Sequence, residues 1–134
     1  MIITGCNTGI GYETALALAL RGARLIMACR DLARAEPAAQ RIRDAVAAAA
    51  IAQNPSGHES NGSKDAGASQ QQVSVMQLDL CSFASVRAFA AAVARRERKV
   101  DVLLCNAGAM MMQQKLTGDG CVQDVGSSEG IARP

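Results

Sequence analysis

The 134-residue sequence lacks long apolar runs, clustered charge and grouped metal ligands, and it has only one tyrosine and one histidine. No apolar stretch approaches the roughly 20 residues of a membrane span, and the chain does not start like a signal peptide. The formal net charge is only +2, with no block of Lys or Arg to mark a nucleic-acid or membrane surface. The single histidine, His58, cannot build a zinc site. We therefore expect no membrane segment, no nucleic-acid partner and no metal.

The five cysteines are odd in number and scattered, with no C-x-x-C pair. This pattern favours free thiols in a reducing compartment over a disulfide framework. We therefore expect a cytoplasmic location. The apolar fraction of 49% is that of a globular chain, and the length allows one domain.

Apolar runs and helical repeats alternate along the chain up to about residue 108. The predicted strands cover residues 1–4, 24–29, 73–80 and 102–105. The predicted helices cover residues 10–20, 31–52 and 82–98, the last with Ser82 as its N-cap. This alternation implies parallel strands joined by right-handed crossovers, in the order 3-2-1-4. The predicted class is α/β, an incomplete Rossmann-like doubly wound sheet.

Four segments carry local expectations. One stripe of the first helix is expected to face the core, and it consists of Ile10, Thr14, Ala17, Leu18 and Arg21, with Leu16 and Leu20 widening the apolar face. Pro37 predicts an irregular or capped turn over residues 32–36, with the regular helix starting at about Pro37. Residues 53–72 are polar and rich in Gly, Ser and Gln, which predicts a disordered insertion. Residues 109–134 show no period and are expected to form an irregular tail.

The strongest motif is T-G-C-N-T-G-I-G over residues 4–11, between a predicted strand and a predicted helix. A dinucleotide's pyrophosphate must approach the backbone closely, which requires positions without a Cβ. Unpaired N–H groups and the positive end of the helix dipole then hold the anion. An ordinary glycine-rich turn is the alternative, and the flanking strand and helix favour the phosphate site.

Arg30 follows the second predicted strand, where a dinucleotide-binding unit reads the adenosine ribose. An acidic residue there would accept a hydrogen bond from a free 2′-hydroxyl, whereas a guanidinium can bind a 2′-phosphate. Arg30 therefore favours NADP(H) over NAD(H). A solvated surface arginine is the alternative, and the adjacent Asp31 weakens the case for the phosphate.

Four motifs in this order, T-G-C-N-T-G-I-G, A-C-R-D, L-D-L and C-N-A-G, resemble those of the short-chain dehydrogenase/reductase family. The stretches G-I-G-Y-E-T-A and A-C-R-D-L-A-R-A resemble its retinol dehydrogenase-like branch, which includes the WW-domain-containing oxidoreductase. The resemblance covers Met1 to about Gly120, apart from the insertion. It implies an oxidoreductase that uses NADP(H) and acts on alcohols or carbonyls, with retinoid-like or other lipophilic substrates.

The resemblance also implies roles for matching positions. The first motif would line the pyrophosphate and adenosine side of the cofactor, Arg30 would contact the 2′-phosphate, the D-L pair would flank the adenine, and N-A-G would steady the sheet beside the cofactor. The implied cofactor-binding residues are Gly5, Asn7, Thr8, Gly9, Ile10, Gly11, Arg30, Asp79, Leu80, Asn106, Ala107 and Gly108. Cys6 and Cys105, inside these motifs, are interpreted as core residues and not as redox groups.

The family's catalytic residues have no counterpart in this chain. The family uses a tyrosine as general acid/base with a lysine four residues later, and a serine that polarises the substrate oxygen. Here the only tyrosine is Tyr12, inside the first motif's helix, and Leu16 stands four residues on. T-G-D-G at residues 117–120 resembles the segment before the family's relay asparagine, but the pattern does not continue. We expect no catalytic residue in this chain.

These observations lead to one expectation about the chain and one alternative. Residues 1–108 are expected to form the dinucleotide-binding half-domain of a truncated, inactive oxidoreductase. The alternative is a non-catalytic dinucleotide-binding or interaction fragment from an incomplete gene model or alternative transcript. Without a fifth strand the fourth strand leaves an open sheet edge, which predicts self-association.

Overall fold

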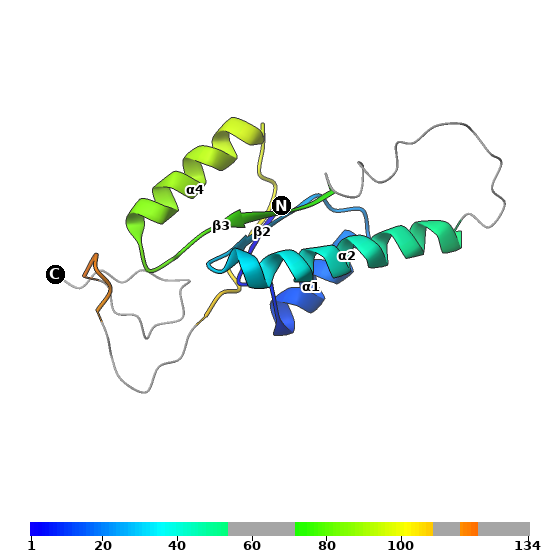
Figure 1. Cartoon of the computed structure of the whole chain (residues 1–134). Helices are drawn as coiled ribbons and strands as arrows, with labels where there is room; N and C mark the ends of the chain where they lie inside the picture. The colour runs from blue at the N-terminus through cyan, green and yellow to red at the C-terminus, as the bar shows by residue number, and fades with distance from the viewer. Residues whose placement is uncertain (54–71, 109–115, 121–134) are drawn as a thin grey trace.

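Four short parallel strands form the centre of the molecule, and their order across the sheet is β3-β2-β1-β4. The computed structural model describes residues 1–53, 72–108 and 116–120. The strands are β1 (Ile2–Thr4), β2 (Leu25–Cys29), β3 (Val73–Gln77) and β4 (Leu103–Leu104). The helices are α1 (Gly9–Ala19), α2 (Leu32–Gln53) and α4 (Phe83–Arg96), as Figure 1 shows. The predicted fold class and strand order are confirmed.

The two central strands are buried along their whole length. Every residue of β1 and of β2 is buried, and the register pairs Ile2 with Ile26 and Thr4 with Ala28. Such continuous apolar runs are typical of parallel strands that are covered on both faces. The sheet is therefore a rigid base for the loops that leave its carboxyl ends.

Helices cover both faces of the sheet, in two separate hydrophobic clusters. On one face α1 and α2 pack against Ile3, Leu25 and Met27, which are fully buried. On the other face α4 packs against a cluster that contains Ile26 and Val93. Figure 1 shows α4 on the opposite side of the strands from α1 and α2. The fold therefore has the three layers of an α/β sheet.

The buried face of α1 differs from the predicted stripe. Gly11, Ala15 and Ala19 are buried, whereas Ile10 is 82% exposed. The helix lies close to the sheet, and only small side chains fit at that contact. Leu18 of the stripe and Leu16 beside it are partly buried and pack against the core. The prediction was wrong at Ile10 because α1 is apolar on most of its surface, so the pattern of hydrophobic residues does not identify the inner face.

Helix α2 begins at Leu32 and runs continuously through Pro37. The first turn is therefore capped, as one of the two expected forms, and the other form, an irregular turn with the regular helix starting only at Pro37, was wrong. The side chain of Asp31 caps this start, because its Oδ1 accepts a hydrogen bond from the backbone N–H of Arg34 (3.1 Å). Pro37 itself faces solvent, and Ala35 and the residues after Pro37 pack on the sheet. Capping and packing offset the one backbone bond that proline removes.

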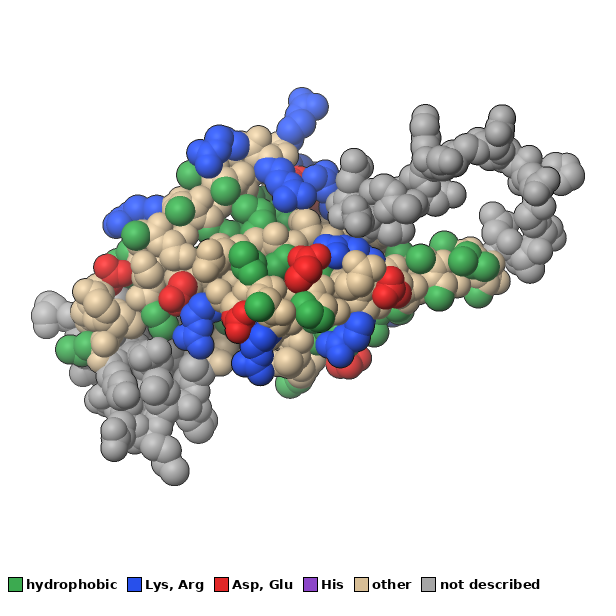
Figure 2. Space-filling model, in the orientation of Figure 1, with side chains coloured by type: hydrophobic (Ala, Val, Ile, Leu, Met, Phe, Trp, Pro, Cys, Tyr) green, Lys and Arg blue, Asp and Glu red, His purple; other side chains and the backbone are tan. Residues whose placement is uncertain are grey.

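The carboxyl end of α2 projects beyond the sheet. Figure 1 shows this extension, and Figure 2 shows hydrophobic side chains on its surface. Ile51 is 75% exposed there. The predicted insertion, apart from its two end residues, lies outside the described residues, as do residues 109–115 and 121–134 of the predicted tail. Gln72 is the last residue of the predicted insertion, and its side-chain amide donates to the carbonyl oxygen of Ala19 (2.8 Å).

Strand β4 lies at one edge of the sheet and, within the described residues, pairs only with β1. Its Leu103 side chain is 58% exposed. Self-association through this edge stays a prediction. None of the helices in the described ranges has the length and hydropathy required to span a membrane, and those same ranges contain no cluster of three or more metal-ligating side chains.

The packing of α2 on the sheet can be tested by replacing alanine with leucine at a buried position and at an exposed one. Ala39 is fully buried, whereas Ala48 is exposed on the same helix. We predict that Ala39→Leu lowers the free energy of unfolding by about 1–3 kcal/mol, because the extra methyl groups have no space. Ala48→Leu should change it by less than about 0.5 kcal/mol. Urea denaturation followed by circular dichroism measures both, and equal midpoints would contradict this packing.

Candidate functional site

The predicted site residues come together at one edge of the sheet. Residues 5–11 follow β1, Arg30 follows β2, Asp79 and Leu80 follow β3, and residues 106–108 follow β4. Because the strands are parallel, their carboxyl ends lie at the same edge. The strand order reverses between β1 and β4, because β2 and β3 lie on one side of β1 and β4 lies on the other, and ligands of such sheets bind in the crevice at that switch point.

Two glycines allow the backbone after β1 to approach the backbone after β4. Gly5 has a φ of +61°, and a Cβ there would lie 2.8 Å from both Cα and Cβ of Ala107. A Cβ on Gly11 would lie 2.8 Å from the carbonyl oxygen of Gly5 and would also collide with the Asn106 amide nitrogen. Neither position has space for a larger residue.

Gly9 differs from these two because its surroundings are open. Its φ is +59°, and a Cβ there would meet no atom within 4 Å. The turn therefore needs glycine for its backbone conformation, and the space beside Gly9 is free for a group from outside the chain.

Asn106 holds the end of β4 against the loop after β1. Its Nδ2 donates hydrogen bonds to the carbonyl oxygens of Thr4 and Gly5, each at 3.0 Å. The hydroxyl oxygen of Thr4 accepts from the backbone N–H groups of Asn106 (3.1 Å) and Ala107 (3.0 Å). These four bonds continue the β1–β4 pairing beyond Leu104, where the strand ends.

Thr4 was missing from the predicted site residues. It is buried, with 5% of its surface exposed. The signal was present in the sequence, because Thr4 is the only polar residue in the run I-I-T and a buried hydroxyl needs hydrogen-bond partners. The sequence could not show that those partners are the amides after β4.

The first turn of α1 points free N–H groups toward this crevice. The helix starts at Gly9, and its N-cap Thr8 is extended (φ −150°) and makes no side-chain capping bond. The turn from Gly9 to Tyr12 contains no acidic residue. The N–H of Tyr12 donates to the carbonyl oxygen of Thr8 (3.4 Å). The N–H groups of Gly9, Ile10 and Gly11 precede this first helical bond, so they and the positive end of the helix dipole are available to an anion.

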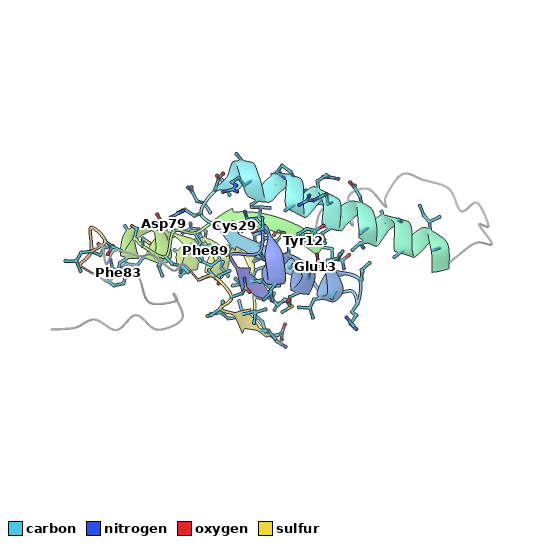
Figure 3. The ribbon with its side chains drawn as sticks, turned by 90° about the horizontal axis from the view of Figure 1, so that it is seen from below. Tyr12, Glu13, Cys29, Asp79, Phe83 and Phe89 are labelled. Carbon is cyan, nitrogen blue, oxygen red and sulfur yellow. The ribbon has the colours of Figure 1, made fainter. Side chains whose placement is uncertain are left out.

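Arg30 lies beyond the end of β2 and is exposed. Among the residues that the structure describes, no hydrogen bond or ion pair is recorded for its side chain, and its guanidinium is available to a ligand. Next to it along the sheet edge, Asp79 is held in place: its N–H donates to the hydroxyl of Ser85 and its Oδ1 accepts from the N–H of Cys81, both at 2.9 Å. Leu80 packs on the α4 cluster. Figure 3 labels Cys29, the last residue of β2, and Asp79, which lies two residues beyond the end of β3.

The turn at residues 117–120 is tied to the start of α4. The Asp119 carboxylate accepts a hydrogen bond from the backbone N–H of Phe83 (2.6 Å), and the Ser82 hydroxyl accepts one from Ser85 (3.3 Å). Ser82 as the N-cap is confirmed. The role of Asp119 was not predicted, because nothing local in the sequence connects it to α4.

The two cysteines of the motifs have different environments. Cys6 is fully buried, as predicted. Cys105 is exposed, so its interpretation as a core residue was wrong. The reason is that β4 ends at Leu104 and lies at the edge of the sheet among the described residues, so the next side chain is not covered.

A parallel 3-2-1-4 sheet with a glycine turn at its switch point defines a Rossmann-like protein. Its residues 1–60 match the family model described as short chain dehydrogenase. Retinol dehydrogenase 13 of Homo sapiens is 40% identical over 120 residues, which is 90% of this chain and 30% of that protein. The chain thus spans about a third of the length of such relatives.

Two solved structures have the same fold. An uncharacterized protein from Mycobacterium Paratuberculosis is 36% identical, with a TM-score of 0.64 over 92% of this chain and 34% of that chain. A short-chain dehydrogenase from Sphingobium yanoikuyae in complex with NADPH is 26% identical, with a TM-score of 0.60 over 89% of this chain and 38% of that chain. This chain belongs to the short-chain dehydrogenase/reductase family, in its retinol dehydrogenase-like branch.

The close contact at Gly11 can be tested against a matched glycine. We predict that Gly11→Ala lowers the free energy of unfolding by about 1–3 kcal/mol, because the new methyl group displaces the Asn106 amide from its two carbonyl partners. Gly118→Ala is the control, since a Cβ there meets no atom within 4 Å. Urea midpoints measure both variants. If Gly11→Ala were as stable as Gly118→Ala, the close approach would be wrong.

Proposed function

We propose that this chain binds NADP(H) at the carboxyl edge of its sheet, with residues 1–108 as the dinucleotide-binding unit of an oxidoreductase. The observation that carries the proposal is the turn between β1 and α1. Two of its glycines pack against the end of β4, and the third leaves open space beside the first turn of a helix. A pyrophosphate needs this combination of close backbone approach and free N–H groups.

The residues of this edge fit a phosphorylated dinucleotide in charge and in shape. In this proposal the N–H groups from Gly9 onward bind the pyrophosphate, and Arg30 binds the 2′-phosphate of the adenosine. Asp79 and Leu80 flank the adenine. The full proposed set is Gly5, Asn7, Thr8, Gly9, Ile10, Gly11, Arg30, Asp79, Leu80, Asn106, Ala107 and Gly108. The relative from Sphingobium yanoikuyae, solved with NADPH, supports the choice of NADP(H).

Asn106 orients the backbone of the loop that would bind the cofactor. Its amide nitrogen holds the carbonyl oxygens of Thr4 and Gly5, so these oxygens point away from the space that the pyrophosphate would occupy. The opposite orientation would place two partial negative charges against an anion. Asn106 is therefore a positioning residue in this proposal.

When bound, the dinucleotide supplies the nicotinamide that carries a hydride. We propose retinoid-like or other lipophilic alcohols and carbonyls as substrates of the protein, and the name of its relatives, retinol dehydrogenase, supports the retinoid part of this choice. We further propose that the 134-residue chain alone does not transfer hydride. Its only tyrosine, Tyr12, lies beneath the guanidinium of Arg41, 5.0 Å from the ring centre, and has no lysine four residues on.

The proposed role of Arg30 gives a direct test of cofactor choice. We predict that Arg30→Ala weakens NADPH binding about 10-fold to 100-fold, because charge-assisted bonds to a phosphate are lost. NADH has no 2′-phosphate, so its affinity should change less than about 3-fold. Isothermal titration with both cofactors measures this, with Arg98→Ala, another exposed arginine, as the control. Equal losses for NADPH and NADH would show that Arg30 does not bind the 2′-phosphate.

A further inference from the structure

Two buried cysteines lie beneath the loop that joins β1 to α1. Cys6 follows Gly5 in that loop, and Cys29 is the last residue of β2. Their exposed fractions are 0% and 3%, and both belong to the hydrophobic cluster under α1 and α2. The cofactor site proposed above uses neither side chain.

The backbone sets the two cysteines on neighbouring segments. Thr4 pairs with Ala28, and the N–H of Gly5 donates to the carbonyl oxygen of Ala28 (3.0 Å), so Cys29 lies level with Gly5. Neighbouring strands are about 4.8 Å apart, and Cys6 comes one residue after the position level with Cys29, so we expect their Cα atoms to lie within the range of about 4.4–6.8 Å that disulfides span. The positive φ of Gly5 turns the chain, so that Cys6 contacts the same cluster as Cys29.

The two thiols interact and differ in acidity. A hydrogen bond from Cys6 is the main cause that lowers the pKa of Cys29 to about 7, against the effect of burial, and loop N–H groups add to it. That hydrogen bond, together with burial, raises the pKa of Cys6. The single Cys6 S–H thus has two acceptors, the Cys29 sulfur and the carbonyl oxygen of Ile3 (3.3 Å), and donates to one of them at a time. Cys29 is thus the better nucleophile and Cys6 the thiol that keeps its proton.

We propose that Cys6 and Cys29 form a reversible intramolecular disulfide, and that this bond weakens binding of the dinucleotide at the adjacent loop. The disulfide follows from the placement of the two side chains. Its effect on binding rests on the function proposed above.

Hydrogen peroxide is the oxidant in this reaction. The Cys29 thiolate attacks one peroxide oxygen, the O–O bond breaks, and the hydroxide that leaves takes up a proton, which gives a sulfenic acid on Cys29. The Cys6 sulfur then attacks the Cys29 sulfur, the S–O bond breaks, and water leaves with the Cys6 proton. Overall two thiols lose two electrons to peroxide, which becomes two waters, and a dithiol reductant reverses the change.

The disulfide would change the shape of the phosphate loop. An S–S bond is about 2.05 Å long, shorter than any hydrogen bond between two thiols, so its formation draws Cys6 toward β2. Asn7 and Thr8 follow Cys6 directly and lead into the first turn of α1. A displacement of this loop moves its N–H groups away from the pyrophosphate, and small misplacements at such sites are costly.

The experiment treats the folded 134-residue chain with hydrogen peroxide, alkylates the remaining thiols after denaturation, and maps tryptic peptides by mass. Cys6 lies in the peptide from Met1 to Arg21, and Cys29 lies in the peptide from Leu25 to Arg30. We expect these two peptides to be joined and to separate after treatment with dithiothreitol. Recovery of both as alkylated monomers from folded, oxidised protein would overturn the disulfide.

A titration of NADPH before and after oxidation tests the second half of the proposal. We expect the dissociation constant to rise on the order of tenfold and to recover on reduction. Cys6→Ala should abolish the rise, whereas Cys105→Ala, at an exposed cysteine, should retain it. If Cys6→Ala does not fold, the peptide map of the unsubstituted chain still decides the disulfide.

The outcomes separate this inference from the proposed function. A joined peptide pair with unchanged NADPH affinity would overturn the link between disulfide and binding. Failure of the reduced chain to bind NADPH would overturn the proposed function and with it this link, while the peptide map would still support or overturn the disulfide.

Discussion

The structure depends on the close contact between two stretches of backbone at the centre of the sheet edge. Gly5 touches Ala107 and Gly11 touches Asn106 at distances that leave no space for a Cβ. The Asn106 amide fills this contact and bonds to two carbonyl oxygens of the loop. Because β4 has only two residues, these bonds, with those to Thr4, hold it beside β1. The same contact shapes the loop in front of α1.

The location of the candidate site could be predicted from the sequence because it follows from topology. Parallel strands end at one edge, so the residues after each strand meet there. This holds even when a predicted strand boundary is misplaced by one or two residues. The glycines were informative because backbone conformation and close approach permit few other residues. Thr4 and Asp119 could not be predicted, because each acts through a partner that is far away in sequence.

Strand order, the presence of α1, α2 and α4 and the cap at Ser82 could also be predicted, since turns and apolar runs mark these elements. The inner face of α1 could not, because Ile10 is more hydrophobic than Gly11 and only the distance to the sheet decides which one is buried. The path through Pro37 depended on capping and packing that outweigh a local penalty. The exposure of Cys105 depended on where β4 ends and on its place in the sheet.

The central claim is that the loop between β1 and α1 is a pyrophosphate site in this chain. Two-dimensional ¹H–¹⁵N NMR of the labelled protein with NADP⁺ tests it most directly, because it observes each backbone N–H separately. The account predicts that the largest shifts fall on Gly9, Ile10 and Gly11, with further shifts at Arg30. Unchanged signals from these amides at millimolar NADP⁺, or shifts confined to other parts of the protein, would contradict it.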